Sequence, residues 1–332
     1  MNKRISYWDN LKFLLILFVV MGHFIDPHTE TNNYAKQIFL FIYCFHMPLF
    51  LFVSGVFYNS RNLRSKILFL VCTGFLLKIL NLISNTLLRD MAPKISLLRD
   101  TSTPWYLFAL AVFMLLRYLI RDKNKWFFLG FSVLMGCVSG YDSSVGDYLY
   151  LSRIIVFFPF YLAGSMVDRN QFTERIKCNY TAYLGAVSVL LLLFYFCHYR
   201  LGEVYIYRHL LTGRNPFTER IISYGFMARL GCYVVSTCVG LSFMILTPQK
   251  HLPLISEWGS NTLNVLFWHK FFFYALTRYT PFFDWYDQGF RGQFAYMLVA
   301  VVLTVIISAF KCFSFPLEYV RRQCFAAVPD RQ

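Results

Sequence analysis

The sequence predicts an all-α protein, a polytopic integral membrane bundle of about ten transmembrane helices. Hydrophobic residues make up 57% of the 332 residues and charged residues only 15%, whereas soluble domains carry about 45–50% and about 25% respectively. The apolar residues form long continuous stretches, which are typical of membrane helices and not of the alternating strands of a membrane β-barrel. These observations exclude a disordered chain, a coiled coil and a water-soluble enzyme of ordinary composition.

Ten apolar stretches are expected to cross the membrane. They cover residues 11–25, 38–58, 67–88, 104–120, 126–140, 151–167, 179–199, 226–246, 261–278 and 292–313. Some are shorter than the about 20 residues that a bilayer core requires, and Gly130, Gly136 and Gly140 interrupt the fifth. Because no internal repeat, low-complexity linker or soluble domain is visible, we expect residues 1–332 to form a single membrane domain.

The distribution of charge predicts the orientation. The chain has a formal net charge of +15, and its basic residues gather in short clusters between the apolar stretches, as the positive-inside rule describes. This pattern favours cytoplasmic termini and a multi-pass protein of the cell (inner) membrane, surrounded by lipid, and no nucleic-acid partner is expected. The nine cysteines form no CxxC pair, so neither a disulfide framework nor a metal site is expected.

The first span carries titratable side chains, which are costly in a membrane and mark candidate functional sites. Lys12 and His23 are eleven positions apart, a rotation within about 20° of three full helical turns and about 16 Å along the axis. Both therefore lie on one helix face, with Asp9 one turn before Lys12. The structural alternative is that Lys12 reaches back to the interface and that His23 caps the helix near water.

Other segments carry further candidates. In the second span His46 is followed by an expected kink at Pro48, a feature typical of a bundle interior, where His46 either assists chemistry or holds a neighbouring helix. Arg61, Arg64 and Lys66 follow that span and are either positive-inside anchors or phosphate ligands. The remaining candidates, in the fourth and ninth spans, are Trp105, Asn261, His269 and Lys270.

Six short motifs follow one another along the chain. They begin with Lys12 and His23, separated by ten residues, and continue with the His46-Met47-Pro48-Leu49 segment that ends at Gly55 and with Arg61-x-x-Arg64. The three later motifs are Pro104-Trp105-Tyr106-Leu107, Phe160-Tyr161-Leu162-Ala163-Gly164, and Trp258-Gly259-Ser260-Asn261-Thr262-Leu263 followed by His269. In this order the set resembles the acyltransferase-3 superfamily of membrane O-acyltransferases, and within it the fucose 4-O-acetylase-like branch.

The resemblance implies an activity and a set of substrates. Members move an acyl group, usually acetyl, from cytoplasmic acyl-coenzyme A to a hydroxyl of an extracytoplasmic or lipid-linked glycan. The expected donor substrate is therefore acetyl-CoA, the expected acceptor is a glycan or lipid-linked sugar, and no metal is expected. Lys12 stands where many members have Arg, so the bidentate contact of a guanidinium is lost there.

The resemblance also implies roles for the candidate residues. His23 is the expected catalytic residue, either as a general base or as a transient acyl carrier. The expected ligands of CoA are Lys12, Arg61, Arg64 and Lys66. The expected supporting residues are Asp9, Lys12, His46, Trp105, Asn261 and His269.

Two other functions are compatible with the sequence. One is an O-succinyl or other acyl transferase of a biofilm or capsule glycan. The other is a proton-coupled transporter, which buried His and Lys residues would suit, although no inverted repeat or matched pair of broken helices is visible. The sequence does not indicate the acceptor, the acyl chain or the oligomeric state.

Overall fold

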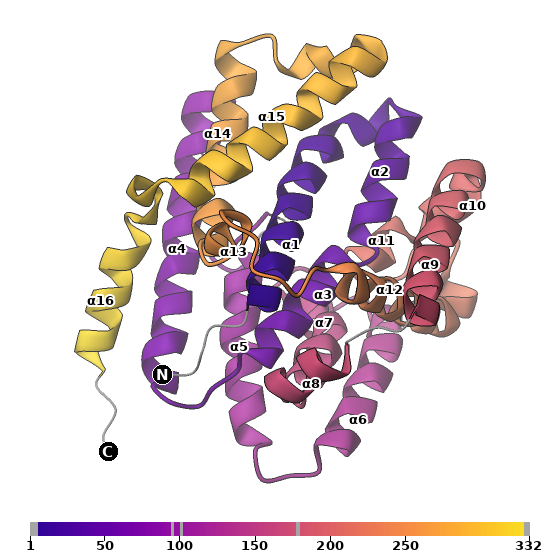
Figure 1. Cartoon of the computed structure of the whole chain (residues 1–332), viewed down its shortest axis with the longest axis vertical. Helices are drawn as coiled ribbons and strands as arrows, with labels where there is room; N and C mark the ends of the chain where they lie inside the picture. The colour runs from indigo at the N-terminus through magenta and orange to yellow at the C-terminus, as the bar shows by residue number, and fades with distance from the viewer. Residues whose placement is uncertain (1–5, 94–95, 100–101, 177–179, 329–332) are drawn as a thin grey trace.

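The computed structural model describes residues 6–93, 96–99, 102–176 and 180–328, and the regular elements in these ranges are helices (Figure 1). An isolated antiparallel bridge joins Arg99 and Tyr148. The predicted all-α bundle is therefore confirmed. The α-helices are α1 (Ser6–Ile25), α2 (Asn33–Tyr43), α3 (His46–Val56), α4 (Leu63–Leu88), α5 (Trp105–Leu119), α6 (Lys125–Val138), α7 (Leu151–Gly164), α8 (Arg169–Arg175), α9 (Tyr180–Tyr199), α10 (Leu201–Val204), α11 (Arg208–Leu211), α12 (Gly225–Leu246), α13 (Ile255–Trp258), α14 (Thr262–Tyr279), α15 (Gly289–Ala309) and α16 (Leu317–Ala327).

All ten predicted spans coincide with helices, but not every helix has the dimensions of a span. Among the described residues, six helical segments are long and apolar enough to cross a membrane, or seven if the bent α7–α8 pair counts as one. Two of the others, α5 and α6, have only 15 and 14 residues. The 18 residues of α14 include His269, Lys270 and Arg278, which make it less apolar. The protein is thus a multi-pass membrane protein in which some predicted spans are shorter or less apolar than a full membrane crossing.

The first helix, α1, is the central helix of the bundle. It packs against α2, α3, α13, α14 and α15, and Figure 1 shows it between the α4–α14–α15 group and the α9–α12 group. The large apolar side chains Trp8, Leu11, Ile16, Val20 and Phe24 point in different directions around its axis, and all are buried. A helix that is apolar all round is typical of an interior position. The titratable side chains of α1 are therefore held inside the protein.

The predicted span 38–58 is divided into two helices one turn before its proline. α2 ends at Tyr43 and α3 begins at His46. Pro48 is the third residue of α3, in the first turn, where a missing N–H leaves no intrahelical bond unmade. The chain therefore breaks before the proline, and the break places His46 at the start of a helix in the middle of the bundle.

Two glycines allow α3 and α7 to approach each other closely. A Cβ atom on Gly55 would overlap the carbonyl oxygen of Tyr161, and one on Gly164 would overlap the carbonyl oxygen of Phe52. Small residues let membrane helices bring their backbones together. This contact fixes α3, and with it one wall of the cavity described below, against the rest of the bundle.

The bundle has two distinct ends (Figure 1). The α3–α4 and α5–α6 connections lie at one of them, which we call the basal end, and α8 lies near it after an 80° bend from α7. At the opposite, apical end lie η1 (Asp26–Glu30) and the α14–α15 turn with η5 (Phe283–Asp287). Four basic residues of the charge pattern that predicts a cytoplasmic basal end lie outside the described residues, namely Lys3, Arg4, Lys177 and Arg331.

Candidate active site

An apolar cavity of about 380 Å³ lies at the centre of the bundle, between α1, α3, α4, α5 and α14. Its walls are mostly aliphatic and aromatic side chains, and the polar groups among them are few. These polar residues are Lys12, Ser54, Tyr106 and Thr262. Such a lining suits a narrow, largely uncharged group and excludes a multiply charged one.

Three helices contribute a stripe of residues whose apical end carries a histidine. Spacings of three and four residues keep side chains on one helix face, so each stripe continues the cavity wall toward the apical end. The three stripes are Lys12, Ile16, Val19 and His23 on α1; Leu263, Leu266 and His269 on α14; and Phe50 and His46 on α3, which runs in the opposite direction. The cavity lining therefore begins at Lys12 on the basal side and ends at Val19, Met47 and Leu266, and the three imidazoles lie just beyond it on the same helices.

His23 and His269 form a stacked pair. Their ring centroids are 5.2 Å apart and their planes differ by 25°. In His269, which is fully buried, Nδ1 donates a hydrogen bond of 2.8 Å to the carbonyl oxygen of Val265. In the neutral ring, Nε2 then carries the lone pair, and it has no hydrogen-bond partner among the described residues. His23 is only half-buried, so the pair combines one enclosed imidazole with a more accessible one.

His46 lies beside this pair and is anchored in the same way. Its Nδ1 donates a 2.8 Å hydrogen bond to the carbonyl oxygen of Ile42, and its ring packs edge-on against Tyr43 at 4.6 Å. Both His46 and Lys270 are close enough to interact electrostatically with His23. Nothing in the described ranges brings three His, Cys, Asp or Glu side chains together as ligands of a metal ion.

The basal side of the cavity is positively charged. Lys12 Nζ pairs with the buried Asp9 carboxylate at 2.7 Å, a proximity that their one-turn spacing predicts. Lys12 Nζ also lies 4.9 Å from the centroid of the Phe57 ring. Arg169, the first residue of α8, lies over the same ring at 5.2 Å. Phe57, which is 40% exposed, is thus held between two cations at the mouth of the cavity.

The predicted phosphate ligands lie at the basal surface. Arg61 and Arg64 are exposed on either side of the start of α4, whereas Lys66 Nζ donates to the carbonyl oxygen of Asn59 at 3.0 Å. Sequence reasoning did not single out Arg169, because its charge reads as one of an ordinary basic cluster. Only the bend between α7 and α8 brings it to the cavity mouth.

Two predicted supporting residues lie away from the cavity lining. The Trp105 ring stacks on Phe157 at 5.6 Å, and the Arg153 guanidinium lies 5.2 Å above it. The Asn261 amide donates to the carbonyl oxygen of Ser308 at 2.7 Å and so fixes the start of α14 against α15. These contacts make both residues positioning groups for the helices that line the cavity.

Tyr106, the neighbour of Trp105 in the same motif, is a cavity residue that sequence reasoning missed. It lines the cavity, and its hydroxyl is 2.9 Å from Ser54 Oγ on α3. The signal that could have found it was present, since the predicted motif contains both aromatic residues. The position of each residue around α5, rather than the residue type, decides whether Trp105 or Tyr106 faces the cavity.

Comparison with known proteins gives two matches. Residues 5–311 match the acyltransferase-3 family model, which is described as an acyltransferase domain. Over 68 residues the chain is 37% identical to the nodulation protein NolL of Sinorhizobium fredii (strain NBRC 101917 / NGR234), a segment that covers 20% of this chain and 19% of that protein. The chain therefore matches only about a fifth of the length of this relative. No solved structure matches.

Proposed function

Because this chain belongs to the acyltransferase-3 family, we propose that it moves an acetyl group from acetyl-CoA to a hydroxyl of a surface or lipid-linked glycan. The family match covers residues 5–311, and acyl transfer at a membrane is the general activity that it supports. The proposal adds four specific parts to this general activity. They are the acetyl donor, its delivery from the cytoplasm, the glycan acceptor and kinship with the fucose 4-O-acetylase-like branch.

One observation carries the proposal: an apolar cavity has a basic mouth at one side, and three imidazoles lie beyond its other side, on the helices that line it. The Lys12–His23 separation on α1 corresponds to about 16 Å. The anionic nucleotide of acetyl-CoA cannot cheaply enter a hydrocarbon-like interior. In our proposal it stays at the basal surface, where the exposed Arg61, Arg64 and Arg169 would bind its phosphates. The acyl-bearing arm would enter the cavity and bring the thioester to the histidines.

His23 is the proposed general base, because imidazole exchanges protons near neutral pH and this ring is the accessible member of the stacked pair. It takes the proton of the acceptor hydroxyl as the oxygen attacks the thioester carbonyl. The new C–O bond forms and the C–S bond breaks, with its electron pair staying on sulfur. The sulfur then receives the proton from His23, which releases CoA and restores the neutral imidazole.

A two-step route uses the same residue. In that route His23 itself attacks the thioester, carries the acyl group on a ring nitrogen and passes it to the acceptor hydroxyl. The two routes differ in whether labelled protein appears before the acceptor is added. The proposal assigns His269 the same role in both: its buried ring, held by Val265, keeps His23 in position.

The test is an acyl-transfer assay with the purified full chain in lipid nanodiscs. Acetyl-CoA labelled in the acetyl group is incubated with a panel of glycan lipids, in parallel with labelled succinyl-CoA. We expect acetyl label on a glycan lipid and release of CoA with wild-type protein, and both at rates about 10²- to 10⁴-fold lower with a correctly assembled His23→Ala variant. Transfer of succinyl but not acetyl would assign the succinyltransferase alternative. Unchanged turnover in the variant would overturn the role of His23.

A transporter would behave differently in the same preparation. It would move a solute across a sealed vesicle without consuming acetyl-CoA, and its activity would depend on the proton gradient. Absence of any CoA release with every donor and acceptor of the panel, together with gradient-driven solute uptake, would replace the acyltransferase proposal.

A further inference from the structure

A second and larger cavity, of about 820 Å³, opens beside α2 and the α10–α11 segment. Its lining is polar and charged, unlike that of the central cavity. The lining residues that matter here are Lys36, Tyr205, Arg208, His209, Glu219 and Arg220. We call it the apical pocket, because one of its walls is tied to η1.

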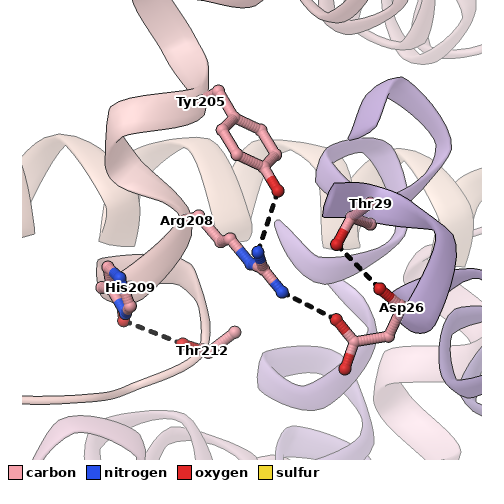
Figure 2. A network of polar contacts seen from close by, with 6 residues as sticks. All are labelled: Asp26, Thr29, Tyr205, Arg208, His209 and Thr212. Atoms are coloured by element: carbon pink, nitrogen blue, oxygen red, sulfur yellow. Dashed lines mark hydrogen bonds and ion pairs between the residues drawn. The ribbon is translucent and has the colours of Figure 1, made fainter. Parts of the chain in front are cut away.

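An ion pair connects the apical pocket to the end of α1 (Figure 2). Arg208 Nη2 lies 2.8 Å from Asp26 Oδ1, and Arg208 Nη1 donates a 2.9 Å hydrogen bond to the Tyr205 hydroxyl. Thr29 Oγ1 donates to the backbone carbonyl oxygen of Asp26 at 2.7 Å and holds the turn that carries the carboxylate. Asp26 is three residues beyond His23, about 4.5 Å along a helical path, so this wall of the pocket is continuous with the helix that carries His23.

A row of aromatic rings joins the pocket to the imidazoles. The Arg208 guanidinium lies 4.7 Å above the Phe39 ring, Phe39 stacks on Tyr43 at 3.7 Å, and Tyr43 packs against His46 at 4.6 Å. Phe39 is fully buried, whereas Tyr43 is only half-buried. The row runs along one face of α2 into the α2–α3 break and links Arg208 of the pocket to His46 through ring contacts.

The ionisable lining of the apical pocket has an excess of positive charge. Asp26 balances Arg208. In contrast, Lys36 Nζ donates to the neutral amide oxygen of Asn33 at 3.1 Å and lies 5.7 Å from the centroid of the Tyr205 ring, and no carboxylate among the described residues pairs with Lys36 or Arg220. Glu219 is the single acidic residue of the lining. The pKa of His209 is lowered by partial burial of the His209 ring and by the nearby Arg214 and Arg208. This imidazole is therefore held neutral and can exchange hydrogen bonds with hydroxyl groups.

From this arrangement we infer that the apical pocket binds the acceptor and that the acceptor is a negatively charged sugar, bearing a phosphate or a carboxylate. Lys36 and Arg220 bind the anionic group by charge-assisted hydrogen bonds, and the Tyr205 ring and His209 contact the sugar. This inference rests on the proposed function for the acceptor role. The binding chemistry itself follows from the pocket and can be tested without any transfer reaction.

The experiment measures sugar binding by calorimetry, with the full chain in nanodiscs of uncharged phosphatidylcholine. The probes are glucose, glucose 1-phosphate, glucuronic acid and inorganic phosphate. We expect at least one of the charged sugars to bind about tenfold or more tightly than glucose and than phosphate alone. The two charged probes separate a phosphate acceptor from a carboxylate acceptor. Equal binding of glucose and both charged sugars would overturn the inference, as would equally tight binding of inorganic phosphate.

Variants connect this binding to the pocket. Lys36→Gln combined with Arg220→Gln should weaken binding of the charged sugar about tenfold, and the single Arg220→Gln variant should show part of the loss. Arg321→Gln with Arg322→Gln on α16 is the matched control and should leave binding unchanged. Full binding in the pocket variants, with an unchanged elution profile, would contradict the assignment.

The proposed function is tested separately in the same nanodiscs by titration with acetyl-CoA, which should bind equally well to the pocket variants. Failure of acetyl-CoA to bind while the charged sugar binds would reject the acetyl donor and leave the pocket chemistry standing. Binding of acetyl-CoA without a preference for charged sugars would reject the apical pocket alone.

Discussion

At the scale of single residues, the contact on which the proposed mechanism depends is the stack of His23 on His269. The two rings come from helices far apart in the sequence and meet at 5.2 Å. The hydrogen bond from His269 Nδ1 to Val265 fixes the orientation of one ring, and stacking transmits that orientation to the other. A residue of this kind acts through position rather than through its own proton transfer.

We therefore expect His269→Gln to lower turnover about 10- to 100-fold, because a small displacement of a catalytic group costs about that much. The His23→Ala variant should lose about 10²- to 10⁴-fold, the usual contribution of a general base. Adding His269→Gln to His23→Ala should then cost little more, since the second residue acts through the first. The measurement is initial acetyl transfer for the two single variants and the double variant. Multiplicative losses would instead indicate independent roles.

His209 lies outside the membrane-spanning helices, and its pKa predicts that the stability of the folded protein depends on pH. Partial burial and the nearby Arg214 and Arg208 lower this pKa below the ordinary 6.5. Below pH 6.5 the unfolded chain therefore takes up a proton at His209 more readily than the folded protein does. The stability that the neutral ring contributes is present above pH 6.5 and falls as the pH drops toward the lowered folded-state pKa.

Carbethoxylation followed by mass spectrometry can measure this shift, because the reagent attacks neutral imidazole. We expect His209 in the wild-type protein to stay reactive at a lower pH than it does in Arg214→Gln, where one of the two neighbouring cations is gone. Arg200→Gln, which removes a guanidinium paired with Glu203, is the matched control. Identical midpoints in all three proteins would show that Arg214 does not act on this imidazole.

At the scale of helices, the central cavity depends on which face α1 turns toward α3 and α14. Val19 is 4% exposed and lies on the cavity wall one turn before His23. Val19→Phe would add an aromatic ring to the narrow space through which, in our proposal, the acyl-bearing arm passes. We expect turnover with acetyl-CoA to fall at least about tenfold, with binding of free CoA less affected. Kinetic assays and CoA titration measure the two effects, and Val234→Phe on the exposed face of α12 is the control. Unchanged turnover would place the arm elsewhere.

The close approach of α3 and α7 at Gly55 predicts how a larger side chain there affects the thermal stability of the protein. Gly55→Leu would drive a side chain into the carbonyl oxygen of Tyr161, and overpacking of this kind costs about 1–3 kcal/mol or more. We expect a lower midpoint of thermal unfolding in detergent. Gly185→Ala in α9 adds a Cβ into open space and removes a helix-disfavouring glycine, so the midpoint should stay the same or rise. Equal midpoints for Gly55→Leu and wild type would mean that the two helices can separate at little cost.

At the scale of the whole molecule, the sequence predicts the helices better than the contacts between them. Long apolar stretches identify all ten helical regions, and the 3.6-residue period correctly places Lys12 and His23 on one face. The kink expected at Pro48 is present as the α2–α3 break at Cys44 and Phe45, one turn before the proline, because Pro48 has no N–H to donate to the carbonyl oxygen of Cys44. The stacking of His269 on His23 and the approach of Arg169 to Phe57 depend on how distant helices pack. A helical period contains no information about such partners.

We assign different chemistry to the two ends of the molecule, with donor binding at the basal end and acceptor binding at the apical end. If the basal surface binds the CoA phosphates, Arg61→Glu with Arg64→Glu should raise the KM for acetyl-CoA about tenfold or more and leave the KM for the acceptor nearly unchanged. Added salt should raise the wild-type KM for acetyl-CoA in the same direction, since exposed charges are screened. The apical charge reversal Arg291→Glu, at another exposed arginine, is the control and should change neither the KM for acetyl-CoA nor its salt dependence.

Steady-state kinetics with the glycan lipid identified by the panel assay provide the measurement. A rise in both KM values would indicate a general disturbance of the fold, which the elution profile and thermal midpoint would reveal. An unchanged KM for acetyl-CoA would mean that Arg61 and Arg64 serve only as positive-inside anchors. The donor would then have to bind through Lys12 and Arg169, the cations that flank Phe57 at the cavity mouth, and Arg169→Glu would become the variant that raises the KM.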